Sequence, residues 1–434
     1  MSESWMTVDT KLDALKEIID AKQSQEKKNE FVQFEKMYDV IKKFLIKNNL
    51  VLYGGVALNE LLPDKHKIYE NNEIPDYDCF SYKAKQHALE LGKELKKAGY
   101  NYVEVKSGVH AGTIKVFAEF KAAADFTQVT KSFYQFLLQE SLSNNTKYQS
   151  DTKLTVAPPV FLKWSFYKEL SRPEGSLFRW EKIYHRYHIF MKEHGTDKNK
   201  KVSIPNYRDL LTTPCDDPNI QSIISQVDTM VKTHKMPIIG NMAVGVYLSD
   251  YRLFKGKLEC CKLLPTFSKF DVMSEDVQNT VKAMNDFIKL PKGYSLVAKP
   301  RGIRGKGYFD DVMPLRIRLF VKIPQKTEMY SLASIHDVSG NCYSTVNKNG
   351  YTVGTADTVL QYLYAYYMTY TYFEKQTHPE YAEHVWKLIS IFEKYTNTKL
   401  DIAERFSTIC FGKENTLLNV KKENWNKKNF VHRF

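Results

Sequence analysis

"NNLVLYGGVALNELLPDKHKIYENNEIPDYDCFS", residues 48–81, contains the pattern that decides the fold. A short apolar run ends at Gly54 and Gly55, and a helix-forming sequence follows at once. Asp76 and Asp78 close the stretch, and their spacing of two directs both side chains to one face of a strand. A glycine turn at a helix start offers N–H groups to a phosphate, and paired carboxylates can share a metal ion. Together these features predict a nucleotide site.

The composition indicates a globular protein with a polyanionic partner. Of the 434 residues, 43% are hydrophobic and 26% are charged, which is ordinary for a chain of roughly two or three domains. The formal net charge is +13, and such an excess favours nucleic acid as a partner. No apolar stretch approaches a membrane span, so we expect a soluble protein that does not bind membranes.

Cysteine usage bears on the redox compartment. The cysteines are sparse and lack the CxxC spacing that is typical of zinc sites, and they number six: Cys79, Cys215, Cys260, Cys261, Cys342 and Cys410. We therefore expect free thiols in an intracellular reducing environment, without a disulfide framework.

An internal repeat indicates one fold used twice. The sequence MPIIGNMAVGVYL, residues 236–248, aligns without gaps on LVLYGGVALNELL, residues 50–62. Further on, Asp271 falls on Asp78, whereas Lys269 replaces the first acid of the pair. We predict an α/β (α+β) protein with a duplicated fold, in which one copy is active and the other is degenerate.

Two-metal chemistry needs a third carboxylate beside the Asp76–Asp78 pair. Asp125, in the sequence AAADFTQV, is the best-placed candidate on a neighbouring strand, and Glu119 is the alternative. Carboxylate oxygens suit Mg²⁺ or Mn²⁺, which also borrow phosphate oxygens from a nucleotide. Each feature alone occurs by chance, because a lone Asp-x-Asp is often a solvated strand end and a lone Gly-Gly is often a turn. The conjunction, kept in only one copy, favours catalysis.

These residues match the pattern of the DNA polymerase β-like nucleotidyltransferase superfamily. The sequence FLKWSFYKELSRPEGSLFRWEKIYHR, residues 161–186, sharpens the match. It resembles the corresponding stretch of poly(A) polymerase catalytic subunits from large cytoplasmic DNA viruses of the poxvirus, asfarvirus and giant-virus type. Those proteins also carry a degenerate second nucleotidyltransferase domain, so the resemblance covers most of the chain.

The resemblance implies roles for individual residues. Asp76 and Asp78 would bind both metal ions, while Asp125 would bind one ion and help to deprotonate the RNA 3′-hydroxyl. Gly54 and Gly55 would hold the triphosphate of ATP. Lys163 would reach the phosphates, although a surface lysine on an amphipathic helix is an equally good interpretation. Arg172, Arg179, Trp180 and Glu181 would form a structural clamp.

A second basic segment is a weaker candidate. AKPRGIRGKGYFDD, residues 298–311, places Arg301, Arg304 and Lys306 among glycines, which suits a flexible loop on an RNA backbone. A solvated hairpin tip is the alternative interpretation.

The domain prediction follows from these assignments. It comprises, in order, N-terminal helices (1–45), a catalytic nucleotidyltransferase domain (46–135), a helical linker region (136–220), a degenerate nucleotidyltransferase-like domain (221–330) and a C-terminal helical region (331–434).

Three functions remain open on the sequence. The resemblance implies a viral, template-independent polynucleotide adenylyltransferase that adds AMP from ATP to RNA 3′ ends during mRNA processing. A synthase of signalling oligonucleotides shares the same acids, and an RNA-binding pseudoenzyme or processivity subunit is the rival of another class. The first interpretation implies RNA and ATP as partners, a homodimer or processivity subunit as a further partner, and location in the virion and the host cytoplasm.

Overall fold

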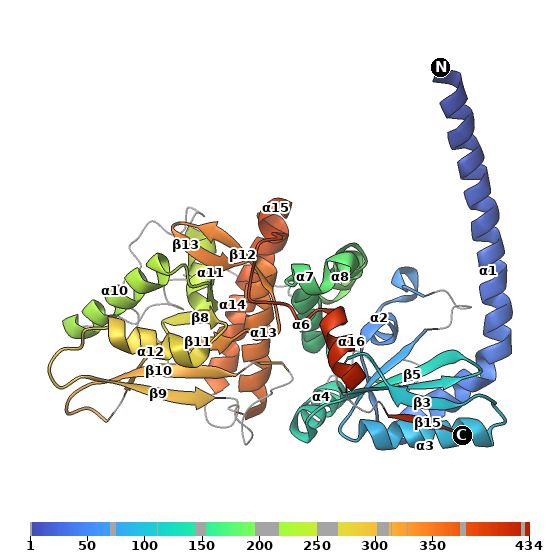
Figure 1. Cartoon of the computed structure of the whole chain (residues 1–434), viewed down its shortest axis with the longest axis horizontal. Coiled ribbons are helices and arrows are strands. Elements are labelled where there is room, and N and C mark those ends of the chain that lie inside the picture. Colours follow the sequence, from blue (N-terminus) through green and yellow to red (C-terminus); the bar gives the residue numbers. More distant parts are fainter. Residues whose placement is uncertain are drawn as a thin grey trace. The chain divides into compact units, whose positions relative to one another are not determined.

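The computed structural model shows two compact units, which we describe separately (Figure 1). Unit 1 comprises Met1–Pro158 and Lys421–Phe434, and unit 2 comprises Pro159–Val420. The structure describes every residue except the following: 1, 70–74, 111, 144–152, 196–216, 250–267, 302–311, 314, 328, 374–378 and 427–429.

Unit 1 contains a sheet that has seven strands among the described residues, in the order β15-β3-β4-β5-β2-β1-β6. Its strands are β1 (Val51–Leu52), β2 (Tyr77–Ser81), β3 (Glu104–Ser107), β4 (Thr113–Ala118), β5 (Lys121–Gln128), β6 (Thr155–Val156) and β15 (Val431–Arg433). Its helices are α1 (Ser2–Lys47), α2 (Gly54–Leu61), the 3₁₀ helix η1 (Asp64–His66), α3 (Ala84–Lys97) and α4 (Lys131–Ser143).

Alternating burial gives the sheet of unit 1 one covered face and one open face. Val105, Val116 and Phe126 are fully buried, whereas their neighbours along each strand are partly exposed. Helix α3, with Leu91 and Leu95 buried, packs against the covered face (Figure 1). The period-two pattern is that of a sheet with a core on one side only.

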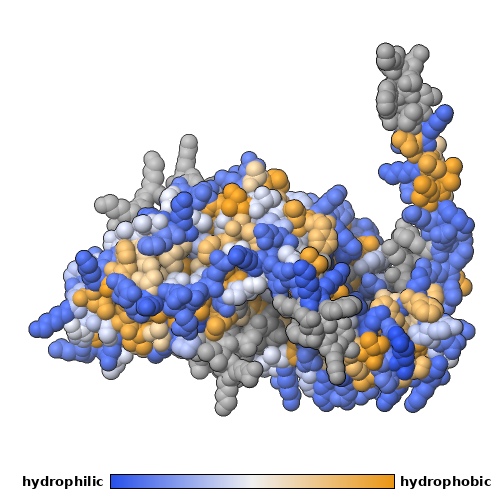
Figure 2. Space-filling view, in the orientation of Figure 1, coloured by the Kyte–Doolittle hydropathy of each residue, from blue (hydrophilic) through white to orange (hydrophobic). Residues whose placement is uncertain are grey.

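Helix α1 begins as an exposed helix and ends as part of the core. Met37, Ile41 and Phe44 are buried in its C-terminal half. Its N-terminal half instead exposes apolar side chains, visible as orange patches on the projecting helix (Figure 2): Leu12, Leu15, Ile18 and Ile19.

Unit 2 contains a sheet that has eight strands in the described part of the chain, in the order β14-β12-β13-β7-β8-β11-β10-β9. The strands are β7 (Ile238–Ile239), β8 (Phe270–Ser274), β9 (Ser295–Arg301), β10 (Arg316–Lys322), β11 (Met329–Asp337), β12 (Tyr343–Lys348), β13 (Tyr351–Gly354) and β14 (Cys410–Phe411).

Helices surround this second sheet. They are α6 (Pro159–Leu170), α7 (Pro173–Ser176), the 3₁₀ helix η2 (Leu177–Arg179), α8 (Trp180–His194), α10 (Pro218–Thr233), α11 (Gly240–Ser249), α12 (Val277–Phe287), α13 (Ala356–Phe373), α14 (Pro379–Thr398) and α15 (Ile402–Arg405), while α16 (Leu417–Asn426) crosses the boundary between the units. Helix α13 is rich in buried tyrosine and packs against α14. None of the helices in the described ranges is both long and apolar enough to cross a bilayer.

The two sheets confirm the predicted duplication. The strand order β3-β4-β5-β2-β1 in unit 1 repeats as β9-β10-β11-β8-β7 in unit 2. In both units the strand after the glycine turn pairs antiparallel with the strand before it, and parallel with the last strand of a three-stranded meander. A helix, α2 or α11, follows the glycine directly in each copy.

The domain limits differ from those predicted. Residues 331–434 were expected to be helical, but β12, β13 and most of β11 fall there and belong to the second sheet. The sheet of unit 1 also includes β6 and β15, which lie outside 46–135. Apart from β11, these strands have six residues or fewer, so their sequences carry little of the apolar alternation that predicts a strand.

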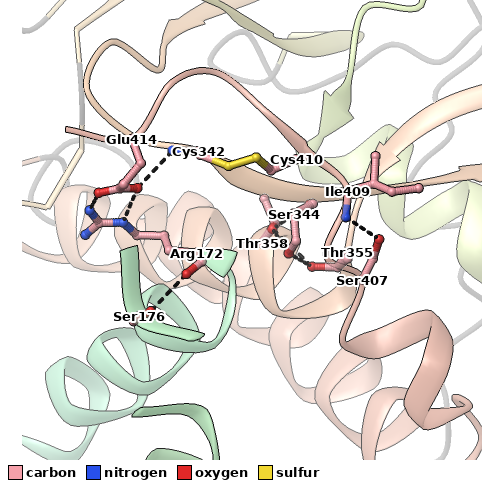
Figure 3. Close-up of a disulfide and its surroundings, with 10 residues drawn as sticks. All are labelled: Arg172, Ser176, Cys342, Ser344, Thr355, Thr358, Ser407, Ile409, Cys410 and Glu414. Atoms are coloured by element: carbon pink, nitrogen blue, oxygen red, sulfur yellow. Dashed lines mark hydrogen bonds and ion pairs between the residues drawn. A yellow bond between two sulfur atoms is a disulfide. The ribbon is translucent and has the colours of Figure 1, made fainter. Parts of the chain in front are cut away.

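The expectation of free thiols is wrong for one pair of cysteines. Cys342 and Cys410 form a disulfide with a Cα–Cα distance of 5.5 Å (Figure 3). Antiparallel pairing of β12 with β14 brings them together across 68 residues of chain, a separation that hides the pairing in the sequence. Cys79 is free and buried, and the remaining three cysteines lie outside the described residues.

Candidate active site

The glycine turn between β1 and α2 accommodates no side chain at either glycine. Tyr53 is extended, and Gly54 then adopts the left-handed conformation, with φ of +70°. A β-carbon on Gly54 would lie 2.6 Å from Oδ2 of Asp78. On Gly55 it would collide with the Tyr69 hydroxyl. The start of α2 and the Asp78 carboxylate therefore lie close together with no side chain between them.

The predicted acids lie on neighbouring strands of unit 1. Asp76 directly precedes β2, while Asp78 lies within β2 and is the register partner of Asp125 on β5. Residues two apart on a strand share a face, as do partners in a ladder. Asp76 is exposed, and the Asp125 side chain is only 17% exposed. Asp78 and Asp125 thus lie opposite each other on the interior strands β2 and β5, and Asp76 lies directly before β2.

Burial and neighbouring carboxylates shift pKa values at this site. Burial is the main cause that raises the pKa of the Asp125 carboxyl, and the charge of Asp76 adds to the rise. The ammonium of Lys115, which forms an ion pair with Asp125, acts in the opposite direction. Burial, followed by the charge of Asp78, also raises the pKa of the Tyr53 hydroxyl. Divalent cations would neutralise the charge of these carboxylates.

The carboxylate oxygens of Asp76, Asp78 and Asp125 do not all lie within 4.8 Å of one another in this structure. Among the described residues, the one group of three potential ligands with atoms within 4.8 Å of one another is Glu174, Cys342 and Cys410. Those two sulfurs are bonded to each other, so this group is not a metal site. The acids of unit 1 nevertheless offer only carboxylate oxygens, the donors that Mg²⁺ and Mn²⁺ prefer. Their chemistry therefore fits these ions, and Lys115 is the side chain that now engages Asp125.

The alternative third acid, Glu119, has another environment. It lies in the turn between β4 and β5 with φ of +50°. Its Oε1 accepts a hydrogen bond of 2.5 Å from the backbone N–H of Asn101. Register with Asp78 therefore favours Asp125 over Glu119.

Lys163 occupies a buried position in unit 2. Its side chain is 3% exposed, and Nζ lies 3.3 Å from Oε2 of Glu393 on α14. The other oxygen of Glu393 accepts hydrogen bonds from the hydroxyls of Tyr167 and Tyr364, at 2.6 and 2.8 Å. These contacts favour a structural role for Lys163 over a contact with phosphate.

The clamp implied by the sequence motif is partly present. Arg172 forms an ion pair with Glu414, and Oε2 of Glu414 also accepts the backbone N–H of Cys342 at 3.0 Å (Figure 3). The Trp180 indole donates to the carbonyl of Glu169 at 3.0 Å. The partner of Arg172 is thus a residue far along the chain and not Glu181 of the motif.

The predicted RNA loop is mostly outside the described residues. Arg301 ends β9, and its side chain is not described, while Arg304 and Lys306 lie in the undescribed range 302–311. A role in RNA binding therefore stays a prediction for all three.

The second copy keeps the glycine turn. Gly240 has φ of +66°, and a β-carbon there would collide with the carboxylate of Asp271. Gly54 and Asp78 have the same relationship in the first copy. The turn and its carboxylate are therefore part of the duplicated fold itself.

The second copy lacks the other two acids. Lys269 stands at the position of the first acid, and Ser334 is the register partner of Asp271 at the position of the third. Asp271 is buried and accepts a hydrogen bond of 2.8 Å from the Tyr366 hydroxyl. Buried Arg318 is the register partner of Ser334. The described partners of the Asp271 carboxylate are thus side chains of the protein, the Tyr366 hydroxyl and His336 Nε2 at 3.4 Å.

Two residues of the site, Lys115 and Tyr69, were missed in the sequence. The alternation of TIKVFAEF, residues 113–120, could have indicated Lys115. It places Lys115 and Phe117 on the face opposite buried Val116. No such pattern indicated Tyr69, because only the fold brings it over the glycine turn.

Comparison with known structures identifies the class of fold. The structure resembles the crystal structure of the Megavirus polyadenylate synthase with a TM-score of 0.73. The likeness covers 93% of this chain and 80% of that chain at 18% sequence identity. It supports the duplicated nucleotidyltransferase-like fold.

Sequence comparison finds similar proteins for part of the chain. Residues 39–176 match the family described as poly(A) polymerase catalytic subunit. Proteins of that name from African swine fever virus (isolate Pig/Kenya/KEN-50/1950) and Acanthamoeba polyphaga mimivirus are 26% and 27% identical, over 42% and 44% of this chain. The chain spans 40% and 30% of those two proteins. The resemblance predicted from the sequence is thus confirmed.

Proposed function

We propose that this chain is the catalytic subunit of a poly(A) polymerase, which adds AMP from ATP to the 3′ end of RNA without a template. The register of Asp78 with Asp125, beside the Gly54 turn, is the observation that carries the proposal. The family match over residues 39–176 supports both the reaction and its substrates.

The reaction is an in-line attack of the RNA 3′-hydroxyl on the α-phosphate of ATP, with pyrophosphate as the leaving group. Asp76, Asp78 and Asp125 would hold two Mg²⁺ or Mn²⁺ ions, which when bound stabilise the charge on the reacting oxygens. Catalysis then depends mainly on positioning and electrostatics.

Different residues of unit 1 would have different roles in this reaction. The N-terminus of α2 presents backbone N–H groups, starting at Gly55, to the triphosphate. Asp125 would bind one metal ion and help to deprotonate the RNA 3′-hydroxyl. The Tyr69 hydroxyl lies over Gly55 and is placed to contact the same phosphates.

The proposal also covers where the chain acts and which partners it has. The two named relatives are viral proteins, and we infer that this chain acts on viral transcripts in the host cytoplasm and in the virion. A second copy of the chain or a processivity subunit stays a prediction.

The test supplies the purified chain with a short single-stranded RNA, Mg²⁺ or Mn²⁺, and each nucleoside triphosphate in turn. We expect a ladder of extended RNA with ATP, and none from an Asp76→Asn/Asp78→Asn variant. Oligonucleotides formed from ATP without a primer, and stimulated by double-stranded nucleic acid, would instead identify a signal synthase. RNA binding without extension under all conditions would identify a pseudoenzyme.

A further inference from the structure

We propose that Lys115 and Lys106 bind two successive phosphates of single-stranded RNA next to its 3′ end, on the open face of the catalytic sheet. The inference rests on the proposed function and adds a path for the RNA substrate. Neither lysine was a candidate in the sequence, and the basic loop 298–311 that was a candidate lies in unit 2.

Strand register places both lysines in one row with the acids. Asp78 on β2 pairs with Asp125 on β5, Asp125 with Lys115 on β4, and Lys115 with Lys106 on β3. Residues paired across strands point to the same face, and neighbouring strands lie about 4.8 Å apart. The row therefore runs from two acids to two lysines in regular steps.

The row lies on the face that the core leaves open. The Lys115 and Lys106 side chains are 35% and 40% exposed, whereas Val105 and Val116 beside them are buried on the other face. A nucleic-acid chain with its 3′-hydroxyl at Asp125 can thus extend along the row. Its first phosphate would lie by Lys115 and its second by Lys106.

Carboxylates offset the repulsion between the two lysines in this structure. Like charges directly opposite each other on a sheet are destabilising, and Lys115 and Lys106 are such a pair. The charge of Lys115 is balanced by its ion pair with Asp125. Metal ions bound to Asp125 would break this pair, and the Lys115 ammonium could then bind phosphate.

The surface next to Lys106, on the side of β15, also carries a net positive charge. Glu104 forms ion pairs with Lys106 at 2.7 Å and with Arg433 at 2.9 Å, so one carboxylate meets two cations. The Phe117 ring lies 4.3 Å below the Lys106 ammonium and positions it. The strand β15 that carries Arg433 is the next strand of the sheet, which continues the basic surface outward.

The experiment combines lysine variants with RNA primers that carry one neutral methylphosphonate linkage. For the wild-type chain, we expect a neutral group at the last or the penultimate linkage to raise the KM for RNA about tenfold. Lys106→Gln should raise the KM for unmodified RNA by a similar factor, with kcat and the KM for ATP unchanged. In that variant the penultimate methylphosphonate should have no further effect, because the pair that it breaks is already absent.

Lys96→Gln is the matched control. Lys96 is exposed on α3, which covers the opposite face of the sheet, and its loss changes the net charge equally. RNA binding followed by fluorescence anisotropy gives a readout apart from catalysis: Lys106→Gln should reduce the slope of log K against log salt by about 0.7, more than Lys96→Gln does.

The inference is overturned if a penultimate methylphosphonate raises the KM for RNA of Lys106→Gln as much as that of the wild-type chain. It is also overturned if Lys106→Gln and Lys96→Gln have the same salt slope. Lys115→Gln adds a second test, because it should lose sensitivity to the last linkage only. If the wild-type chain extends no RNA, the proposed function fails, while the anisotropy measurement still decides whether the row binds RNA.

Discussion

Gly54 and Gly240 have the same left-handed conformation in the two copies, and each lies against a carboxylate. Alanine in this conformation costs about 1–2 kcal/mol, and its β-carbon would also displace Asp78 or Asp271. We therefore expect Gly54→Ala and Gly240→Ala to lower the free energy of unfolding in urea by similar amounts. Only Gly54→Ala should lose nucleotide addition at saturating ATP and RNA. Equal losses of kcat in both variants would contradict an inactive second copy.

A substitution of Asp78 tests the proposed metal site directly. Asp78→Asn removes one charge from the row that would hold the cations, and we expect kcat to fall by about a hundredfold or more. The fold should persist, because removal of one of several neighbouring carboxylates relieves repulsion. Single-turnover extension measures the first effect, and circular dichroism measures the second. Titration of Mn²⁺ by electron paramagnetic resonance should also show weaker binding, whereas unchanged Mn²⁺ affinity would move the metal site elsewhere.

At the scale of elements, helix α6 supplies a buried charge to unit 2. Lys163→Met would leave Glu393 buried without its cation, and breaking such a pair costs about 3–5 kcal/mol. The double variant Lys163→Met/Glu393→Gln should recover much of this loss, because the neutral amide that replaces the carboxylate would still accept hydrogen bonds from the two tyrosines. Urea denaturation measures both.

The same double variant decides between structure and phosphate binding. If Lys163 is structural, the KM of the variant for ATP should match that of the wild-type chain. A KM for ATP that rises about tenfold or more in a stable double variant would return Lys163 to the triphosphate site.

Elements whose signals are local could be predicted from the sequence. The glycine turn, the Asp-x-Asp strand and the helix after each turn follow from residues a few positions apart, and the repeat made their duplication visible. The partners of Lys163 and Arg172 lie 230 and 242 residues away. No spacing rule links such residues, so Glu393 and Glu414 could not be found without the fold.

Across the whole molecule, both ends of the chain contribute to unit 1. The chain leaves unit 1 at Pro158 and returns at Lys421, and β15 then pairs with β3 in the sheet of unit 1. Phe434 lies against Gly92, where a β-carbon would come within 2.5 Å of its ring. The last residues therefore belong to unit 1, although the sequence there carries no motif.

The disulfide anchors the returning chain within unit 2. Cys342–Cys410 closes a loop of 68 residues, for which chain entropy gives about 4 kcal/mol of stability, and Glu414 just beyond it binds Arg172. We expect Cys342→Ser/Cys410→Ser to lower the melting temperature to that of the wild-type chain under reductant. The variant itself should not respond to reductant, and Cys79→Ser, which removes the buried free thiol, should keep the wild-type response. Alkylation of Cys342 and Cys410 in the native, unreduced protein, followed by mass spectrometry, would contradict the bridge, because bonded sulfurs do not react.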